Sequence, residues 1–442
     1  MASAAVVGIL ASVTGCTETE EPRPRFANDP IPTREQPPFL PTLDTTASPV
    51  MPPALSTPVR LDPAQLLRAR GAPRHIYFTS DQALWVLDSE SESADELWSA
   101  DKGAAIQSVA ASPAGDFVAL LIEPNSGSAE REIVLLDASG AEQMRAENLA
   151  APLGVDEATA TAIDWSPQGD QLLITFDPGG IVGMPVDGEG EPRLIVAAEQ
   201  AISPLEAKWS PTGEAVAYVA TGAESELAEL FIAGATASPP ASGPTVVPID
   251  AGRGVRGLAW TPDGRELLIV QGDSAGIGGG GDLWRIAPDG SQRALVASAG
   301  TAAPVGRVGI FRPSPAGDAV AYTVEAPSTD GATFHSLWVR QMSSDPGTAI
   351  QINVPEGERV TTIWWSQSGF LFATSSDLAE SGEERSPELS IYRAVANGDP
   401  QLLLRIGSER GTPVASGSPA AAEAEASPIA ANGDATSDNR SD

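Results

Sequence analysis

The sequence predicts an all-β fold, a single β-propeller built from four-stranded blades. A turn motif of the type Ser-Pro-x-Gly recurs along the chain, an apolar run follows each copy, and further strand-like segments precede the next copy. Four antiparallel strands in each repeat, with both faces of the sheet covered by neighbouring repeats, are typical of propeller blades. The elements below are taken in the order in which they support this fold.

The turn motif occurs five times in full and once in degenerate form. Its first residues are Ser112, Ser166, Ser210, Thr261, Ser314 and Ser366. Successive copies are 54, 44, 51, 53 and 52 residues apart. The hydroxyl caps the turn, Pro fixes φ at the second position, and Gly allows left-handed backbone at the exit. Tryptophan directly precedes four copies, at Trp165, Trp209, Trp260 and Trp365.

The segments after each turn predict the rest of a blade. A nearly continuous apolar run comes first, for example Phe117–Ile122 or Ala319–Val324. Continuous apolarity in a short, β-branched run predicts a strand that is covered on both faces. A third and a fourth strand follow, such as Leu283–Ile286 and Arg293–Val296. Each repeat therefore supplies the four strands of one blade.

One more set of strands lies upstream of the first turn. It consists of His75–Thr79, Ala83–Leu87 and Glu96–Trp98, and it lacks a Ser-Pro-x-Gly turn. We expect seven blades, with the first inner strand drawn from about residues 55–61. The alternative is six complete blades and an appended partial one.

The N-terminus carries a pattern of a different kind. Residues 2–13 form an uncharged apolar run, too short to span a bilayer but suited to the hydrophobic region of a signal peptide. The run ends in Val13-Thr14-Gly15-Cys16, which resembles the lipobox of bacterial lipoproteins. The resemblance implies that Cys16 is lipidated and becomes the first residue of the mature protein. No Lys or Arg precedes the run, which departs from the usual signal-peptide pattern.

These observations predict four regions in the chain. Residues 1–15 are a lipoprotein-type signal peptide, and 16–54 are a disordered linker whose many prolines keep it extended. Residues 55–407 form the propeller. Residues 408–442 are rich in Ala, Ser and acidic residues and are expected to be a disordered tail.

Composition limits the function. The formal net charge of −33 excludes a typical nucleic-acid binder, which needs Lys and Arg for phosphate contacts. One Cys and two His leave no Cys-based zinc site, and we expect no metal and no cofactor. Gly272-Asp273-Ser274-Ala275-Gly276 matches the nucleophile-elbow pattern, but consecutive glycines and a strand follow it instead of a helix. A flexible loop is the better interpretation, and we expect a protein without catalytic residues.

The predicted propeller has two different faces. The short Ser-Pro-x-Gly turns lie on one face, hereafter the turn face. The loops between second and third strands lie on the opposite face, hereafter the long-loop face, and several of them are long. Our hypothesis is that acids there favour a basic partner, with candidates Glu224, Glu226, Glu229, Glu380, Glu383 and Glu384. The alternative is that these charges only solvate the loops.

The Trp-Ser-Pro-x-Gly turn, the apolar strand after it and the later Leu-Trp or Ile-Tyr strand resemble the WD40-like (PD40) repeat of TolB-type propellers. The resemblance covers about residues 75–407 and implies the fold, while this repeat serves many functions. We expect a lipid-anchored propeller on the outer side of the cytoplasmic membrane that binds a protein, peptide or glycan. One alternative is a propeller lyase or hydrolase that uses the axial funnel. Another is a periplasmic accessory protein of a transport complex.

Overall fold

A computed structural model describes most of the chain from residue 71 to residue 406, together with Ala64, Leu67 and the strand Val414–Ala415. The gaps within that range are 81, 126–129, 155–157, 189, 198–202, 222–226, 236–242, 251, 273–280, 299–305, 328–332, 343–348 and 377–388. Contacts divide the chain into two compact units, Met1–Ser56 and Thr57–Asp442, and all of the described residues belong to the second.

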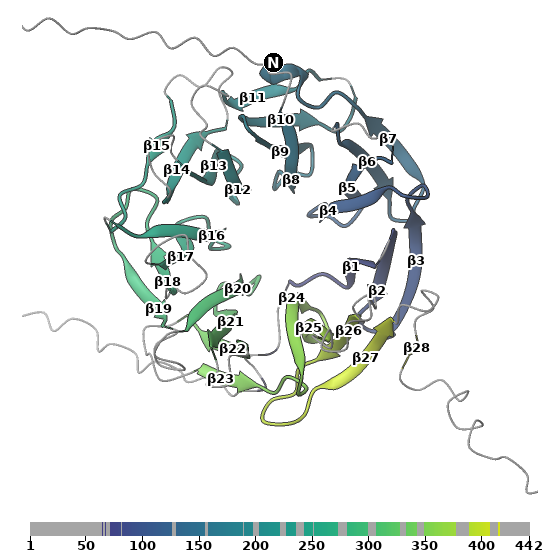
Figure 1. Cartoon of the computed structure of the whole chain (residues 1–442), viewed down its shortest axis with the longest axis vertical. Helices are drawn as coiled ribbons and strands as arrows, with labels where there is room; N and C mark the ends of the chain where they lie inside the picture. The colour runs from purple at the N-terminus through teal and green to yellow at the C-terminus, as the bar shows by residue number, and fades with distance from the viewer. Residues whose placement is uncertain are drawn as a thin grey trace, which may run out of the picture. The chain divides into compact units, whose positions relative to one another are not determined.

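The described strands form seven blades around a central axis, so the fold is a β-propeller (Figure 1). The first blade contains β1 (His75–Ser80), β2 (Ala83–Asp88) and β3 (Ser93–Ser99). The second contains β4 (Ala105–Ala111), β5 (Phe117–Glu123), β6 (Glu132–Asp137) and β7 (Glu142–Ala146). The third contains β8 (Thr159–Trp165), β9 (Gln171–Asp177), β10 (Ile181–Pro185) and β11 (Arg193–Val196), preceded by the 3-10 turn η1 (Ala151–Leu153).

The remaining four blades repeat this order. The fourth contains β12 (Ser203–Trp209), β13 (Ala215–Thr221), β14 (Ala228–Gly234) and β15 (Thr245–Val246). The fifth contains β16 (Gly254–Trp260), β17 (Leu267–Gly272), β18 (Gly281–Ile286) and β19 (Ala294–Ala297). The sixth contains β20 (Arg307–Pro313), β21 (Ala319–Pro327), β22 (Thr333–Gln341) and β23 (Ala349–Ile352). The seventh contains β24 (Glu358–Ser366), β25 (Gly369–Ser376), β26 (Leu389–Arg393), β27 (Gln401–Ile406) and β28 (Val414–Ala415).

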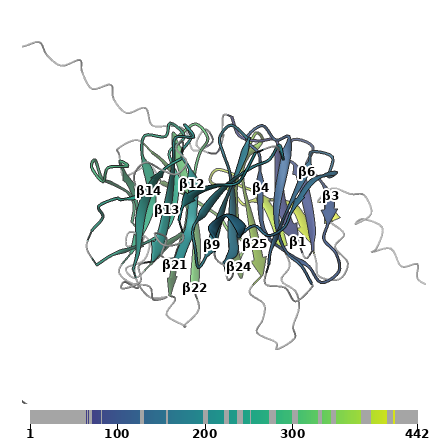
Figure 2. The same cartoon turned by 90° about the horizontal axis from the view of Figure 1, so that it is seen from above.

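Neighbouring strands within every blade run antiparallel, as the repeat predicts. The inner strands β4, β8, β12, β16, β20 and β24 surround the axis, and the last strands of the blades lie at the rim (Figure 1). Seen from the side, the blades stand next to one another with their strands roughly along the axis (Figure 2). One parallel residue pair, Gly281 with Arg307, joins the fifth blade to the sixth.

The turn motif folds as its chemistry predicts. In the sixth blade, the amide of Ala319 donates to Oγ of Ser314 at 3.0 Å, and the amide of Gly317 donates to the Ser314 carbonyl at 2.9 Å. Gly317 has a φ of 73°, a left-handed conformation that a side chain would strain. The same hydrogen bond from the chain after the turn to the first hydroxyl recurs at Ser112 and Ser210. The repeated Ser or Thr is therefore a structural residue.

Three of the four tryptophans before the turns connect neighbouring blades through their indole N–H groups. The indole N–H of Trp165 donates to the carbonyl of Ala110 in the preceding blade at 2.8 Å. Trp260 and Trp365 donate in the same way to the carbonyls of Lys208 and Arg312, at 3.2 and 3.3 Å. Each bond joins the turn-face ends of two adjacent inner strands, so the Trp-Ser-Pro motif also fixes how blades are spaced.

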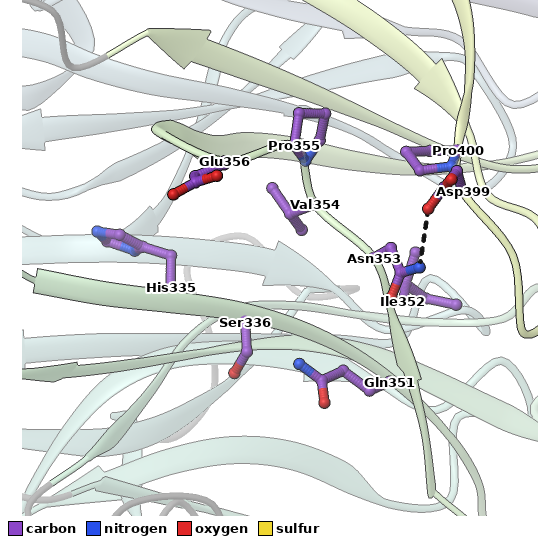
Figure 3. A pocket seen from close by; sticks show the side chains of 10 residues that line it. All are labelled: His335, Ser336, Gln351, Ile352, Asn353, Val354, Pro355, Glu356, Asp399 and Pro400. Carbon is purple, nitrogen blue, oxygen red and sulfur yellow. Dashed lines mark hydrogen bonds between the residues drawn. The ribbon is translucent and has the colours of Figure 1, made fainter.

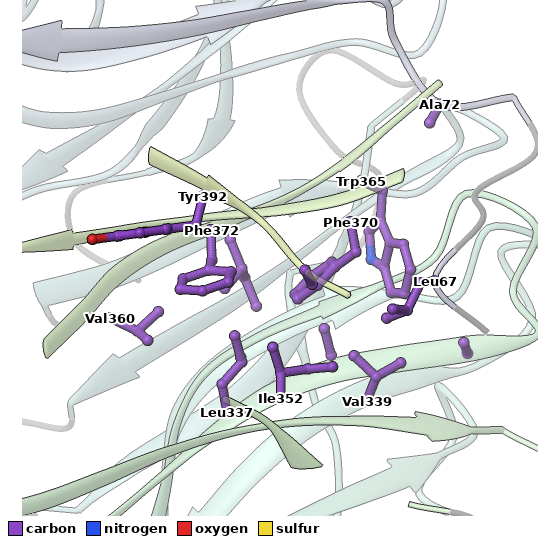
Figure 4. Packing of buried hydrophobic residues seen from close by; sticks show 14 residues of the cluster. Leu67, Ala72, Leu337, Val339, Ile352, Val360, Trp365, Phe370, Phe372 and Tyr392 are labelled. Atoms are coloured by element: carbon purple, nitrogen blue, oxygen red, sulfur yellow. The ribbon is translucent and has the colours of Figure 1, made fainter. Parts of the chain in front are cut away.

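The hydrophobic core lies between blades, because each sheet buries both of its faces. Between the sixth and seventh blades, Trp365, Phe370, Phe372 and Tyr392 pack against residues such as Leu337 (Figure 4). The rings of Phe372 and Tyr392 stack with centroids 5.4 Å apart. Leu67 and Ala72, which precede the first strand, also belong to this cluster.

The first blade differs from the others. Its first strand, β1, begins close to the turn of the seventh blade, where the amide of Gln367 donates to the carbonyl of Pro73 at 3.2 Å. It therefore runs away from the turn face, in the direction of the second strand of every other blade. This agrees with the predicted set of outer strands. The inner strand expected from residues 55–61 lies outside the described residues.

The limits predicted for the four regions stay predictions, because the proposed signal peptide, linker and most of the tail lie outside the described residues. Among the residues that the structure does describe, no helix is long and apolar enough to cross a membrane.

Candidate functional site

Six inner strands carry a β-bulge at the same place. In each of them one extra residue interrupts the register with the second strand. The extra residue lies five positions before the first residue of the turn, at Gln107, Thr161, Leu205, Arg256, Gly309 and Thr361. Bulges redirect side chains and are frequent near functional sites. This level of the inner strands therefore differs chemically from blade to blade although its backbone repeats.

Opposite charges join the inner strands of the third and fourth blades. Oδ2 of Asp164 on β8 accepts a hydrogen bond from the amide of Trp209 at 3.3 Å. Nζ of Lys208 on β12 lies 3.5 Å from Oδ1 of the same carboxylate. These charges are therefore used to hold two blades together.

Two further charged groups on the inner strands are less well solvated. Oε2 of Glu206 accepts from the amide of Leu258 in the next blade at 3.2 Å, and burial raises the pKa of this carboxyl. Arg312 on β20 remains accessible to solvent, but the surrounding protein lowers the pKa of its guanidinium by desolvation. This guanidinium forms no hydrogen bond or ion pair with any described residue. Glu206 and Asp164 interact with it only by longer-range electrostatic attraction.

A cavity of about 540 Å³ lies beside Arg312. Residues 77–80 of β1 form one wall, and parts of β4 and β24 form the walls on either side, including Gln107 and Trp364. These are the inner strands of the second and seventh blades, so the cavity occupies the place where the inner strand of the first blade would run.

A second cavity, hereafter the rim cleft, lies between the outer strands of the sixth and seventh blades (Figure 3). Its volume is about 510 Å³. The lining residues are His335, Ser336, Gln351, Ile352, Asn353, Val354, Pro355, Glu356, Asp399 and Pro400. The side-chain amide of Asn353 donates to Asp399 at 3.3 Å and to the carbonyl of Gly398 at 3.2 Å, and these bonds connect the two blades across the cleft.

The rim cleft is acidic. The side chains of Glu356 and Asp399 are exposed, and neither carboxylate forms an ion pair with a residue in the described part of the chain. No Lys or Arg lines the cleft. An arrangement of two carboxylates with amide and hydroxyl groups suits a cationic group that can also donate hydrogen bonds.

Most of the residues singled out in the sequence lie outside the described residues. This applies to Cys16 with Val13, Thr14 and Gly15, to Ser274, and to the acids Glu224, Glu226, Glu380, Glu383 and Glu384. Glu229 is described, and its exposed side chain lies on β14 opposite Ala220. Only one of the six predicted acids is therefore described, and the acidic long-loop face stays a prediction.

The described residues offer no metal-binding group of three or more His, Cys, Asp or Glu side chains. His75 is exposed at the start of β1, and His335 lies on β22, so the two histidines belong to different blades.

Sequence reasoning missed both the rim cleft and the role of Arg312. The cleft combines β22, the connection after β23 and the hairpin before β27, and no spacing in the sequence indicates that these segments meet. Arg312 had a detectable signal, because it occupies the same place before its turn as Asp164 and Lys208, two residues ahead of the first turn residue. An alignment of the six turns would have shown that this position is charged in the third, fourth and sixth blades.

Comparisons with known proteins give this chain no function. No protein-family model and no curated protein matches this chain. Among solved structures, it is similar to the β-propeller domain of Cps50 from Myceliophteria thermophila, with 13% identity over 71% of this chain and 94% of that one and a TM-score of 0.49. A structure described as TolB from Agrobacterium tumefaciens is 15% identical over 76% of this chain and 92% of its own, with a TM-score of 0.40.

An oligogalacturonate lyase from Vibrio parahaemolyticus is 11% identical over 76% of this chain and 86% of that one, with a TM-score of 0.49. These proteins have different functions, and similarity at this level concerns the fold alone.

Proposed function

We propose that the chain is a lipid-anchored β-propeller on the outer side of the cytoplasmic membrane and that it binds a basic protein or peptide. The anchor is Cys16, the only cysteine of the chain, at the end of a lipobox-like segment. The Pro-rich stretch that follows serves as the tether. The propeller supplies the binding surface and has no catalytic role.

The observation that carries the binding proposal is the acidic rim cleft. Glu356 and Asp399 present two carboxylates that lack a basic partner among the described residues, in a chain whose net charge is −33. Lys or Arg side chains of a partner would neutralise these carboxylates, and such side chains can also donate hydrogen bonds to the amide oxygens of Gln351 and Asn353. Long-range attraction by the acidic protein would also speed the encounter with a basic partner.

The binding proposal is tested by crosslinking and pull-down from membranes with the double variant Glu356→Gln and Asp399→Asn. We expect at least a tenfold loss of the captured basic protein. The control is Asp95→Asn with Glu96→Gln, which removes two exposed acids from β3 without touching the cleft. Equal capture by both double variants would contradict the role of the cleft.

The anchor is tested separately with Cys16→Ser. Wild-type protein is expected to stay with salt-washed membranes, and the serine variant is expected to be released. Retention of the variant in washed membranes would refute lipidation at Cys16, whatever the result for the cleft. Recovery of transport-complex subunits with the wild-type protein would identify the partner as such a complex.

A propeller lyase or hydrolase is the second candidate, and the largely buried carboxyl of Glu206 together with the cavity beside Arg312 favours it. Burial raises the pKa of Glu206, which suits a general acid, and Arg312 faces a cavity. The test is a screen of acidic oligosaccharides and esters with wild-type protein and Glu206→Gln. Turnover that disappears in the variant, while the thermal unfolding midpoint is kept, would establish the enzyme.

A further inference from the structure

The cavity of about 540 Å³ has one charged side chain, that of Arg312, among its described lining residues. No Asp or Glu stands among those residues, although the chain contains 59 acidic residues. The rim cleft has the opposite composition, since Glu356 and Asp399 line it without a described Lys or Arg. A volume of this size is ordinary for a small-molecule site. The two cavities therefore suit ligands of opposite charge.

Arg312 lacks a partner within contact distance. Its guanidinium forms no hydrogen bond and no ion pair within the described part of the chain. The two carboxylates that attract it from farther away have partners of their own, because Asp164 lies 3.5 Å from Lys208 and Glu206 accepts from the amide of Leu258 at 3.2 Å. An arginine keeps its charge at neutral pH even where the surroundings disfavour it. A poorly solvated guanidinium without an anion destabilises the folded chain, and an anion from solution would offset this cost.

Hydroxyl-bearing residues line much of the remaining cavity. Ser108 on β4 and Thr362 on β24 stand at the same step of their strands, four positions before the first turn residue, and Thr79 belongs to the wall that β1 forms. None of these three hydroxyls has a hydrogen-bond partner among the residues that the structure describes. Each can donate one hydrogen bond and accept others. Arg312 thus supplies the charge of the site, and the hydroxyls supply directional groups for the rest of a ligand.

We propose that this cavity binds a small organic anion and that Arg312 holds the carboxylate or phosphate group of that ligand. The planar guanidinium can donate two parallel hydrogen bonds to either group. Trp364, Ser108 and Thr362 remain for the uncharged part of the ligand. Because the net charge of −33 repels anions at long range, binding has to come from the contacts within the site. Neither the rim cleft nor a lipid anchor takes part, and no turnover is required, so this proposal stands independently of the proposed function.

The first test is ligand-induced stabilisation of the full chain. The charged probes are gluconate, which carries a carboxylate, and glycerol phosphate, and their neutral counterparts are glucose and glycerol, all measured at one ionic strength. We expect at least one charged probe at saturation to raise the thermal unfolding midpoint by roughly 2 °C, with no shift from its neutral counterpart. A response to one charged probe alone identifies the group that Arg312 holds. No response to either charged probe would overturn the proposal.

Two variants show whether Arg312 holds the anion. Arg312→Gln removes the guanidinium, and we expect this variant to lose the response to the charged probe. Arg265→Gln is the matched control, because it removes the same charge from a side chain that is 84% exposed and lies outside the cavity lining. Equal responses in the two variants would overturn the proposal. A lower midpoint of Arg312→Gln than of Arg265→Gln without ligand would overturn it too, because the guanidinium would then be needed to hold the fold.

Chemical modification measures whether the guanidinium faces the solution. Phenylglyoxal reacts with accessible arginine side chains, and peptide mapping identifies the modified residue. We expect Arg312 to be modified in the full chain, and the stabilising probe to slow this reaction at least tenfold without changing the rate at Arg265. Absence of modification would mean that the chain itself covers the guanidinium and would refute the proposal. Modification that the probe does not slow would refute it equally, since the anion would then bind elsewhere.

Discussion

The boundary between the third and fourth blades and the boundary between the seventh and first blades are built differently. At the former, adjacent inner strands are joined directly, through Asp164 to the Trp209 amide and to Lys208. At the latter, the first blade has no described inner strand, and the bonds lie farther from the axis. There Arg393 donates to Glu92 at 2.6 Å, to the carbonyl of Ser89 at 3.1 Å and to Oγ of Ser368 at 3.1 Å.

The difference indicates that a propeller can close its ring with side-chain contacts outside the repeated motif where the described repeat lacks an inner strand. The repeated motif supplies inner-strand contacts at ordinary boundaries. At the closing boundary, Arg393 and an apolar cluster that includes Phe78 and Ile391 connect parts of the chain that are about three hundred residues apart, while the segment around Leu67 packs between the sixth and seventh blades. The following experiments compare the two kinds of boundary, beginning with the largest expected effect.

Leu67→Ala should have the largest effect, because Leu67 is only 6% exposed and anchors the segment before the first blade in the cluster between the sixth and seventh blades. We expect a loss of about 2–5 kcal/mol in the free energy of unfolding, from lost burial and the cavity left behind. Chemical denaturation measures it. The matched control is Leu205→Ala on β12, which is 56% exposed and should change stability by less than about 0.5 kcal/mol. Similar losses in both would mean that the closing segment contributes no special packing.

Arg393→Met tests the hydrogen bonds at the closing boundary. The substitution removes the guanidinium and its hydrogen bonds to three acceptors but keeps most of the apolar stem. We expect the free energy of unfolding to fall by about 1.5–3 kcal/mol. Arg145→Met on the rim of the second blade is the control, because Arg145 forms exposed ion pairs with Glu132 and Glu142. Such pairs are worth about 0.2–1 kcal/mol. If the two variants unfold at the same denaturant concentration, Arg393 has no role in closure beyond an ordinary surface pair.

Trp260→Phe and Trp209→Phe compare two ordinary boundaries. Trp260 donates to the carbonyl of Lys208, whereas the indole N–H of Trp209 has no hydrogen-bond partner among the described residues. Both changes remove similar apolar area, so their difference isolates the hydrogen bond between blades. We expect Trp260→Phe to be the more destabilising by about 1 kcal/mol. A larger loss at Trp209 would contradict the proposed role of the indole bonds in spacing the blades.

Glu206→Gln should have the smallest effect, and it should depend on pH. Burial raises the pKa of Glu206 in the folded chain, so the ionised carboxylate disfavours folding relative to the protonated one. The wild type therefore loses stability, relative to the variant, as the pH rises from below about 4 through the raised pKa. Thermal midpoints measured from pH 4 to pH 8 test this. The exposed Glu229→Gln is the control for removal of one charge, and an equal pH trend in both would refute it.

The sequence predicted the blades well because each residue of the turn motif has a local role that can be inferred from its chemistry. Ser314, Pro315 and Gly317 each have one local reason to be there, and the hydrogen bonds found at the turn are those expected. The outer strands of the first blade were also predicted without a turn, since the apolar runs around Tyr77 and Trp85 match those of later blades.

The sites could not be predicted in the same way. The rim cleft is lined by Glu356, in the connection after β23, and by Asp399, in the hairpin before β27, and no spacing in the chain indicates that these segments line one cleft. The acids chosen from the loops were selected by composition, and only Glu229 falls within the described part. Local chemistry thus predicts elements, whereas a site between elements requires the arrangement of whole blades.

The six bulges occupy one step of the repeat. An extra residue five positions before the turn is present in all six described inner strands, although Gln107, Leu205 and Arg256 have nothing in common as side chains. The backbone irregularity therefore does not depend on one particular side chain at that step. Each blade can present its own chemistry there, as Gln107 does toward the cavity beside Arg312, while the register of the strands stays the same.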